Sequence, residues 1–151
     1  MKKLAELHRS LKARFRRQKE PLISINDPDL RVVATAYDET EAASSALARA
    51  TELDTDLPAV LRHHLALPRQ TSQSALELLT ADGWELRPGG RGAESADGQL
   101  EAWQALRVEK LDALVCSQQS SRMAGLAQRH GGQTFGWDAL QPPPNRADPT
   151  K

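Results

Sequence analysis

The stretch from Leu126 to Leu140 constrains the fold of this chain more than any other part of its sequence. It begins as an apolar helical pattern, meets the pair Gly131-Gly132 and continues as an alternating segment over residues 133–140. The glycine pair predicts the end of a helix, because the residue after a helix commonly takes a positive φ. The alternation predicts a strand with Phe135, Trp137 and Ala139 on one face and Thr134, Gly136 and Asp138 on the other. We expect the preceding helix to cover its apolar face.

Five further segments precede this closing strand from residue 59 onward. Short apolar or alternating runs predict three strands, at 59–67, 84–87 and 103–110. Periodic runs predict two helices, one at 69–82 that stops before Gly83 and one that Asp112 caps and that reaches His130. The inward positions expected are Leu61, His63, Leu65, Leu67, Ala75, Leu78, Leu79, Leu106, Val108, Val115, Met123, Leu126 and Ala127. Residues 88–99 hold four of the nine glycines and are expected to be a mobile hairpin loop.

The predicted order from residue 59 is therefore strand, helix, strand, strand, helix, strand. This is the split βαβ arrangement of ferredoxin-like folds. Right-handed crossovers would place both helices on one face of a four-stranded antiparallel sheet. The predicted class is α+β, with a ferredoxin-like domain at 59–140, and the other sheet face is left for solvent, the N-terminal helices or a partner.

The segment 21–58 is expected to be a helical N-terminal extension. Residues 30–37 carry apolar side chains at helical spacing, although Val32, Val33 and Thr35 are β-branched and favour a strand. We expect a helix there. A second helix is expected from Asp38 to about Leu53, because Asp38 and Glu41 resemble a capping box.

The ends of the chain differ from its body in charge and composition. Residues 1–20 carry eight Lys or Arg and two Glu, a net charge of +6, whereas residues 21–151 carry twelve Lys or Arg and eighteen Asp or Glu, a net charge of −6. The first segment is expected to be a basic amphipathic helical arm, with Arg14, Arg16 and Arg17 as partner-contact candidates. It would contact a partner, RNA or an anionic membrane surface, or dock on the body or a second copy. Residues 141–151 are expected to be a disordered proline-rich tail.

The residue types that carry most enzyme chemistry are not grouped in this sequence. His63 and His64 are neighbours on a predicted strand, so their side chains point to opposite faces and cannot share a metal ion. Cys116, the one cysteine, is expected to be a small packing residue, and Asp138 to be a lone carboxylate. We therefore expect a protein that is not an enzyme and that needs no metal or cofactor. No apolar run is long enough to span a bilayer and no secretory signal is found, which favours the cytoplasm.

The three tryptophans are the remaining candidates for contacts with a partner. Trp137 alternates with Phe135 and is expected in the core. Trp103 begins a predicted strand beside the glycine-rich loop, and it is the tryptophan most expected to be exposed as an interface anchor.

Several of these pieces together resemble the regulator of ribonuclease activity B family, whose members are protein inhibitors of ribonuclease E. The resemblance covers about residues 32–140. The motifs that carry it are Val60-Leu-Arg-His-His-Leu65, Asp82-Gly83-Trp84-Glu85, Leu126-Ala127, Gly131-Gly132 and Gly136-Trp137-Asp138-Ala139. The positions in these motifs that we take as the family signature are His63, His64, Gly83, Trp84, Gly131, Gly132, Gly136 and Trp137. The family usually has Tyr-Asp before Gly-Trp, where this chain has Thr134-Phe135. Its best-known members also carry strongly acidic tails, whereas this chain has a basic N-terminal segment and a proline-rich C-terminal segment.

The resemblance implies a protein that binds an endoribonuclease of the ribonuclease E/G type and modulates RNA turnover. An RNA-binding module is the main alternative, because RNA-recognition motifs share this strand and helix order. Such a module needs aromatic side chains on its two central strands, and only Trp103 is available there. The arm at 1–20 is a second route to nonspecific RNA contact. A small-ligand sensor made of paired ferredoxin-like domains is a third possibility. The oligomeric state is left open.

Overall fold

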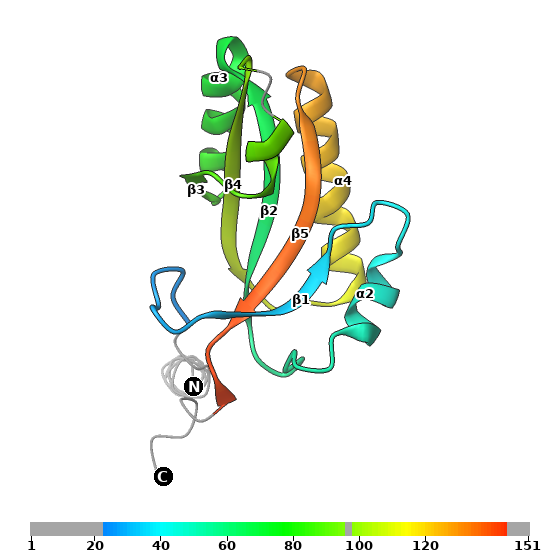
Figure 1. Cartoon of the computed structure of the whole chain (residues 1–151). Coiled ribbons are helices and arrows are strands. Elements are labelled where there is room, and N and C mark those ends of the chain that lie inside the picture. The colour runs from blue at the N-terminus through cyan, green and yellow to red at the C-terminus, as the bar shows by residue number, and fades with distance from the viewer. Residues whose placement is uncertain (1–22, 96–97, 145–151) are drawn as a thin grey trace, which may run out of the picture.

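A five-stranded antiparallel sheet organises the computed structural model, which describes residues 23–95 and 98–144 (Figure 1). The strands lie in the order β1-β5-β2-β4-β3. In chain order the elements are β1 (Arg31–Ala36), α2 (Ala43–Arg49), β2 (Ala59–Pro68), α3 (Arg69–Ala81), β3 (Glu85–Pro88), the 3-10 helix η1 (Arg91–Ser95), β4 (Leu100–Glu109), α4 (Ala113–Arg129) and β5 (Gln133–Gln141). The predicted α+β class and the element order from residue 59 are confirmed. The predicted four-stranded sheet is wrong, because β1 pairs with β5 as a fifth strand.

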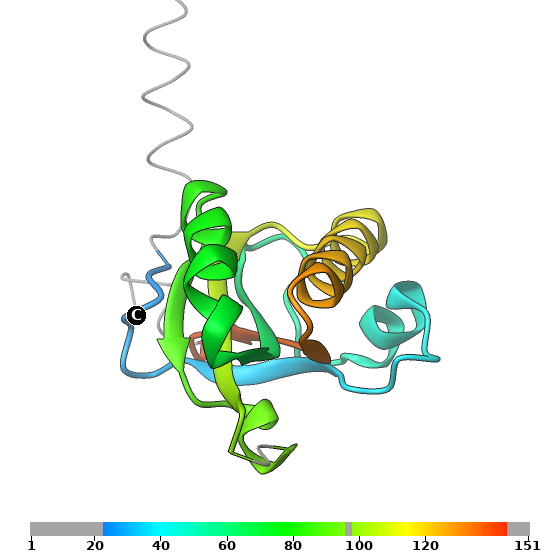
Figure 2. The ribbon, with the colours of Figure 1, turned by 90° about the horizontal axis from the view of Figure 1, so that it is seen from above.

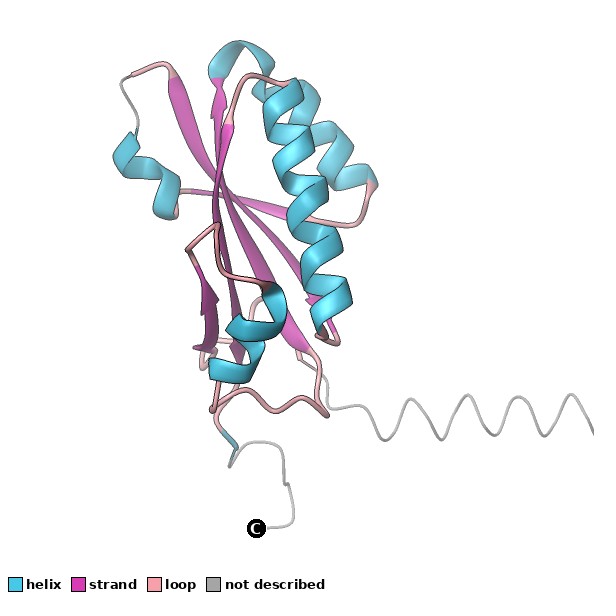
Figure 3. Cartoon of the chain, turned by 90° about the vertical axis from the view of Figure 1, so that its right-hand side faces the viewer, coloured by secondary structure: helices cyan, strands magenta, loops and turns pink. Residues whose placement is uncertain are grey.

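The α-helices of the described residues cover one face of this sheet, whereas η1 lies on the opposite face (Figures 2 and 3). We call these the helix face and the open face. The helix face carries the main core, to which β2 contributes three fully buried leucines, Leu61, Leu65 and Leu67. Buried side chains from the helices complete it: Ala46, Ala75, Leu79, Cys116, Met123, Leu126 and Ala127. On the open face, Ile23, Ile25 and Leu30 pack against a smaller apolar cluster of Val60, Leu106 and Leu140.

The predicted helix at 30–37 is wrong, because this segment is strand β1. Its β-branched residues suit a strand, and β5 supplies the antiparallel partner. A register shift between Val32 and Ala34 places Val33 and Ala34 in the core together. Two adjacent buried residues give a strand the apolar spacing of a helix, which explains the wrong prediction.

The predicted helix from Asp38 to Leu53 is also corrected, since α2 is only seven residues long. Asp38 does not cap it. Its Oδ1 accepts hydrogen bonds from the amide and hydroxyl of Thr40, at 2.9 and 2.7 Å, and so closes a turn before the helix. From the last turn of α2, Arg49 pairs with Glu41 at 2.6 Å and donates to the Thr35 carbonyl at 2.8 Å. Arg49 thereby satisfies a backbone group on the outer edge of β1.

Three predicted inward positions do not join the core under the helices, although one of them, Leu106, is buried in the smaller cluster on the open face. Leu78 is 53% exposed, because α3 packs through Ala75 and Leu79. Leu106 and Val108 lie on the open face, since the register pairs Leu106 with Arg62 and Val108 with Val60. Alternation within one strand does not say which of its two faces meets the core. The pairing register with the neighbouring strand decides this.

Two boundary predictions are corrected as well. The predicted loop at 88–99 contains η1, and Gly92 lies so close to β2 that a Cβ there would be 2.7 Å from the Leu65 carbonyl oxygen. The predicted tail begins too early, because Gln141 is the last residue of β5 and is only 3% exposed. Its side-chain amide exchanges two hydrogen bonds of 3.0 Å with the backbone of Asp54 and fixes the loop before β2.

A bulge in β5 separates the two aromatic residues that were predicted to share a face. Trp137 pairs with His63, whereas Thr134 pairs with Leu65, so β5 has one residue more than β2 across this interval. Gly136 allows the bulge with a φ of +82°. Trp137 is buried on the helix face, and Phe135 is half-buried beside Tyr37 and Arg91.

We expect Gly136→Ala to lower the free energy of unfolding by at least about 2 kcal/mol, because the left-handed conformation and the added volume both oppose a methyl group. A Cβ at Gly136 would lie 2.3 Å from the Ala36 carbonyl oxygen. Gly125→Ala is the matched control, since Gly125 lies within α4 and its Cβ would meet only the far end of the Arg129 side chain, at 3.3 Å. Urea titration of both variants checks this. Equal stabilities would contradict the account of the bulge.

Candidate functional site

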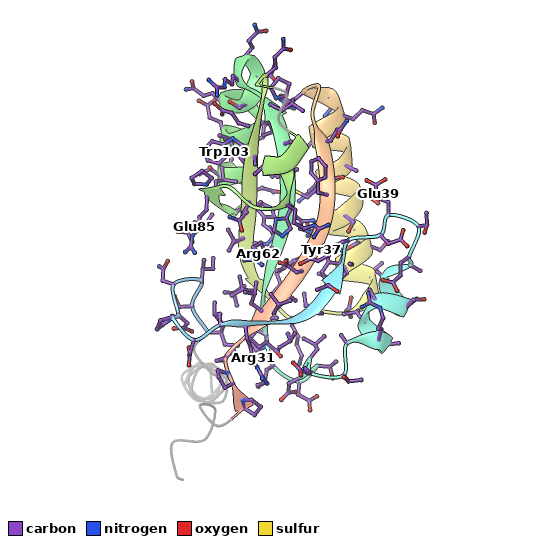
Figure 4. All side chains as sticks on the ribbon, viewed as in Figure 1. Arg31, Tyr37, Glu39, Arg62, Glu85 and Trp103 are labelled. Carbon is purple, nitrogen blue, oxygen red and sulfur yellow. The ribbon has the colours of Figure 1, made fainter. Side chains whose placement is uncertain are left out.

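Four polar side chains from three different segments meet on the open face and form the polar cluster Tyr37, Arg62, His64 and Asp138. Tyr37 follows β1, Arg62 and His64 alternate along β2, and Asp138 lies on β5 directly opposite Arg62. The side chains of Arg62 and Tyr37 converge on the middle of the sheet (Figure 4). Asp138 is the one carboxylate of this cluster, as predicted, but all three other groups bind it, and the sequence spacing indicated none of these partners.

Asp138 is the centre of the cluster and is 1% exposed. Arg62 binds it with two nitrogens, Nε to Oδ1 at 2.7 Å and Nη2 to Oδ2 at 2.9 Å. The Tyr37 hydroxyl donates to Oδ2 at 2.6 Å, and His64 Nε2 lies 3.1 Å from the same oxygen. A bidentate Arg–carboxylate pair with further donors is the arrangement that compensates the desolvation of a buried charge.

His64 connects this cluster to η1. Its Nδ1 accepts a hydrogen bond of 3.2 Å from the Arg91 amide, so the ring proton of a neutral imidazole is assigned to Nε2, where it is donated to Asp138. Gly90 permits the close approach, since a Cβ there would be 2.7 Å from Nδ1. The Arg91 guanidinium lies over the Tyr37 ring, 3.6 Å from its centroid. Both nitrogens of this histidine therefore hold η1 and β5 against β2.

Three of the four groups in the cluster, Tyr37, Arg62 and Asp138, each keep one charge state near neutral pH. Burial acts to raise the pKa of Asp138, but hydrogen bonds from His64, Arg62 and Tyr37 outweigh it and lower this pKa to about 2. Burial and the hydrogen bond to Asp138 raise the pKa of Tyr37 to about 12. The hydrogen bond to Asp138 also raises the pKa of Arg62. Proton transfer near pH 7 needs a group that titrates there, which none of these three does.

His63 and His64 occupy opposite faces, as predicted. His63 is 2% exposed on the helix face, and its ring stands edge-on to Trp84 with the centroids 5.7 Å apart. The Arg107 guanidinium lies over the same indole at 4.1 Å. Burial lowers the pKa of His63 to about 3, and the ring is neutral. Its Nε2 has no hydrogen-bond partner in the described part of the chain.

The glycines singled out in the sequence stand at helix ends and close approaches. Gly83 and Gly131 follow α3 and α4 with φ values of +92° and +78°. Gly132 passes next to β2, where a Cβ would lie 2.3 Å from the Ala66 carbonyl oxygen. With Gly136 at the bulge, Gly131 and Gly132 let β5 turn back and pair with β2, whereas Gly83 leads into β3.

Of the four candidates for partner contact, the structure describes only Trp103. Trp103 is half-buried against the main core on the helix face, and its Nε1 is shielded, with no partner among the described residues. Arg14, Arg16 and Arg17 lie outside the residues that the structure describes. Cys116 is fully buried, and burial raises the pKa of its thiol to about 12, in keeping with the predicted packing role.

A second candidate region lies along β5, where β1 leaves it. The pairing of β1 covers residues 137–141 of β5 only, so the outer edge of residues 133–135 has no strand beside it (Figure 1). Two hollows meet at this edge. The α4 groove, of about 410 Å³, runs between α4 and the β1–α2 connection; the Tyr37 hollow, of about 560 Å³, lies beside Tyr37, Arg91 and Phe135. Three residues line both: Glu39, Ala124 and Thr134.

Sequence reasoning missed the polar cluster because its members are far apart in the chain. Arg62, His64 and Tyr37 are separated from Asp138 by 76, 74 and 101 positions. The only available signal was that Arg62 and Asp138 would be opposite each other if their strands were paired in this register.

No protein-family model matches the chain, and no curated protein matches it significantly. Among residues 23–95 and 98–144, no three His, Cys, Asp or Glu side chains are grouped closely enough to hold a metal ion. No helix in that part of the chain is both long and apolar enough to cross a bilayer.

Proposed function

We propose that this chain is a protein-binding regulator of an endoribonuclease of the ribonuclease E/G type, acting without catalysis of its own on RNA turnover in the cytoplasm. We also propose that β2 to β5, together with α3 and α4, form a ferredoxin-like core and that β1 is an edge strand added to it. It rests on the resemblance to the regulator of ribonuclease activity B family.

The observation that carries the proposal is that the scattered signature residues belong to one connected structural unit. Gly131 and Gly132 return the chain to β2, Gly136 makes the bulge, and Trp137 enters the core. His64 binds the aspartate that follows Trp137 in the Gly136–Ala139 motif. Residues joined in this way are expected to occur together in related chains, which supports reading the motifs as one family pattern.

The charge distribution supports a basic protein partner. Residues 38–56 contain six carboxylates and one arginine: Asp38, Glu39, Glu41, Arg49, Glu52, Asp54 and Asp56. A ribonuclease must present basic surfaces, because it neutralises the phosphates of its substrate. An acidic flank around α2 is electrostatically complementary to such a surface and would steer the two proteins together.

The alternative of an RNA-binding module has less support. Base stacking needs aromatic side chains on the exposed face of the central strands. Trp103 packs on the helix face instead, and the open face of β2 and β4 carries Val60, Arg62, His64, Gln104, Leu106 and Val108. Contact with RNA through Arg14, Arg16 and Arg17 is the part of this alternative that is retained as a proposal.

Mixing the full chain with the cognate endoribonuclease at micromolar concentration is expected to give a complex of defined stoichiometry in analytical ultracentrifugation. The triple variant Arg14→Gln, Arg16→Gln, Arg17→Gln is expected to keep this complex and to lose any binding of nonspecific RNA. Any nonspecific RNA binding by the wild-type chain should weaken steeply as the salt concentration rises. Absence of a complex would remove the proposed function. Salt-resistant RNA binding by the triple variant would favour the RNA-binding module.

A further inference from the structure

We infer that the uncovered edge of β5 at residues 133–135 is a docking site for an extended basic segment of a protein partner. The segment would add one strand to the sheet, with alternate side chains in the α4 groove and the Tyr37 hollow. In strand addition of this kind, hydrogen bonds between the two backbones provide the affinity, and pockets for alternate side chains provide the specificity. The inference rests on the proposed function only for the identity of the partner.

The geometry of the edge indicates a strand as the occupant. β1 stops at Ala36, where Gly136 holds it so close that an added Cβ would lie 2.8 Å from the Tyr37 Cα. Beyond this point the chain turns away toward α2, and β5 continues without a neighbour on that side (Figure 1). An unpaired strand edge presents backbone donors and acceptors that another chain can use.

The lining of the α4 groove indicates a basic side chain. Asp38, Glu39 and Glu41 stand along it. Asp38 is engaged by Thr40 and Glu41 by Arg49, whereas Glu39 is exposed and makes no ion pair or hydrogen bond within the described residues. A lysine or arginine can lay its aliphatic stem on apolar surface while its charge meets a carboxylate at the rim.

The floor of the same groove gives a second, independent indication of a ligand. It contains Trp137, Met123 and His63. His63 is 2% exposed, and its Nε2 has no hydrogen-bond partner in the part of the chain described. A buried polar atom without a partner carries a free-energy cost that a ligand can relieve. Because the imidazole is neutral, it adds no positive charge that would repel a cation.

The Tyr37 hollow fits the next side chain of the segment. Its lining is mixed, with the aromatic side chains of Tyr37 and Phe135 among the polar residues Glu39, Arg91, Gln133 and Thr134. An apolar side chain can pack on the two aromatic rings, so the occupant that we infer is a segment in which basic and apolar residues alternate. Glu39 stands where the two hollows join and is the single carboxylate that lines both.

The test uses the full chain and an acetylated octapeptide of alternating lysine and valine, with a glutamate–valine octapeptide as the charge control. Saturating lysine–valine peptide is expected to slow hydrogen exchange of those amides of residues 133–135 that point away from β2, and Glu39→Lys to weaken binding roughly tenfold. Glu85→Lys, the same exchange on the opposite edge strand β3, is expected to change the affinity less than about twofold (Figure 4). Circular dichroism of both variants confirms that they are folded.

Protection elsewhere in the chain, or equal losses for Glu39→Lys and Glu85→Lys, would overturn the inference. The two proposals fail separately. A ribonuclease complex without peptide protection at residues 133–135 would remove the docking site and leave the function standing. Peptide protection at this edge without a ribonuclease complex would keep the docking site and remove the function.

Discussion

Asp138→Asn is expected to lower the free energy of unfolding by about 3–5 kcal/mol at neutral pH, the usual cost of removing one partner of a buried ion pair. The amide leaves the Arg62 guanidinium without its counter-charge. It also offers one acceptor oxygen where Tyr37, His64 and both Arg62 nitrogens donated before. Chemical denaturation of the purified variant measures the change.

The loss of stability caused by Asp138→Asn should become smaller at low pH. The pKa of Asp138 is lowered from its ordinary value of 3.8 to about 2. A carboxyl whose pKa is lower in the folded state stabilises the fold above its unfolded pKa, and this contribution is lost as the pH falls through the folded pKa. The difference between wild type and variant should therefore be constant above about pH 5 and shrink between about pH 4 and pH 2.

Asp82→Asn is the matched control for this substitution. Asp82 pairs with Arg122 at the surface, where the two side chains are 40% and 55% exposed. Its loss should cost less than about 1 kcal/mol, because solvent screens exposed pairs. Comparable losses for Asp82→Asn and Asp138→Asn would contradict the buried network.

Trp137→Ala is expected to lower the free energy of unfolding by about 3–5 kcal/mol, as truncation of a large core side chain does. The indole is 4% exposed on the helix face, where it lies in the main core and in the floor of the α4 groove. The cavity would open next to α4 and β2. Differential scanning calorimetry and urea titration both measure the loss.

Two control variants accompany Trp137→Ala. Leu114→Ala removes a side chain that is 65% exposed on α4 and should change stability by less than about 0.5 kcal/mol. Phe135→Ala tests the bulge, since a regular strand would bury Phe135 with Trp137. A loss for Phe135→Ala as large as that for Trp137→Ala would contradict the placement of these two rings on different faces.

Local signals in the sequence were sufficient for part of this fold. The strand at β2, the helices α3 and α4, the cap at Asp112 and the stop at Gly131 follow from periodicity and from residues with one dominant conformational role. Asp112 does accept from the Val115 amide at 2.7 Å. Such features depend on neighbours within a few positions, so a single sequence contains the information.

The remaining features depend on pairing between distant segments. β1 resembled a helix because the break at Val33 gives it helical apolar spacing. Phe135 lies on the face opposite to the one that alternation predicts, because the bulge at Gly136 exists only relative to β2. The partners of Asp138 were hidden for the same reason, as strand register decides which side chains meet across a sheet.

The most direct test of the central claim is the rate at which the cognate ribonuclease E/G-type enzyme cleaves a short single-stranded RNA as the full chain is added. We predict that the rate falls with increasing wild-type protein to a plateau at stoichiometric saturation, and that Glu39→Lys requires roughly tenfold more protein for the same effect. A cleavage rate that does not change up to micromolar wild-type protein would contradict the proposal that this chain regulates an endoribonuclease.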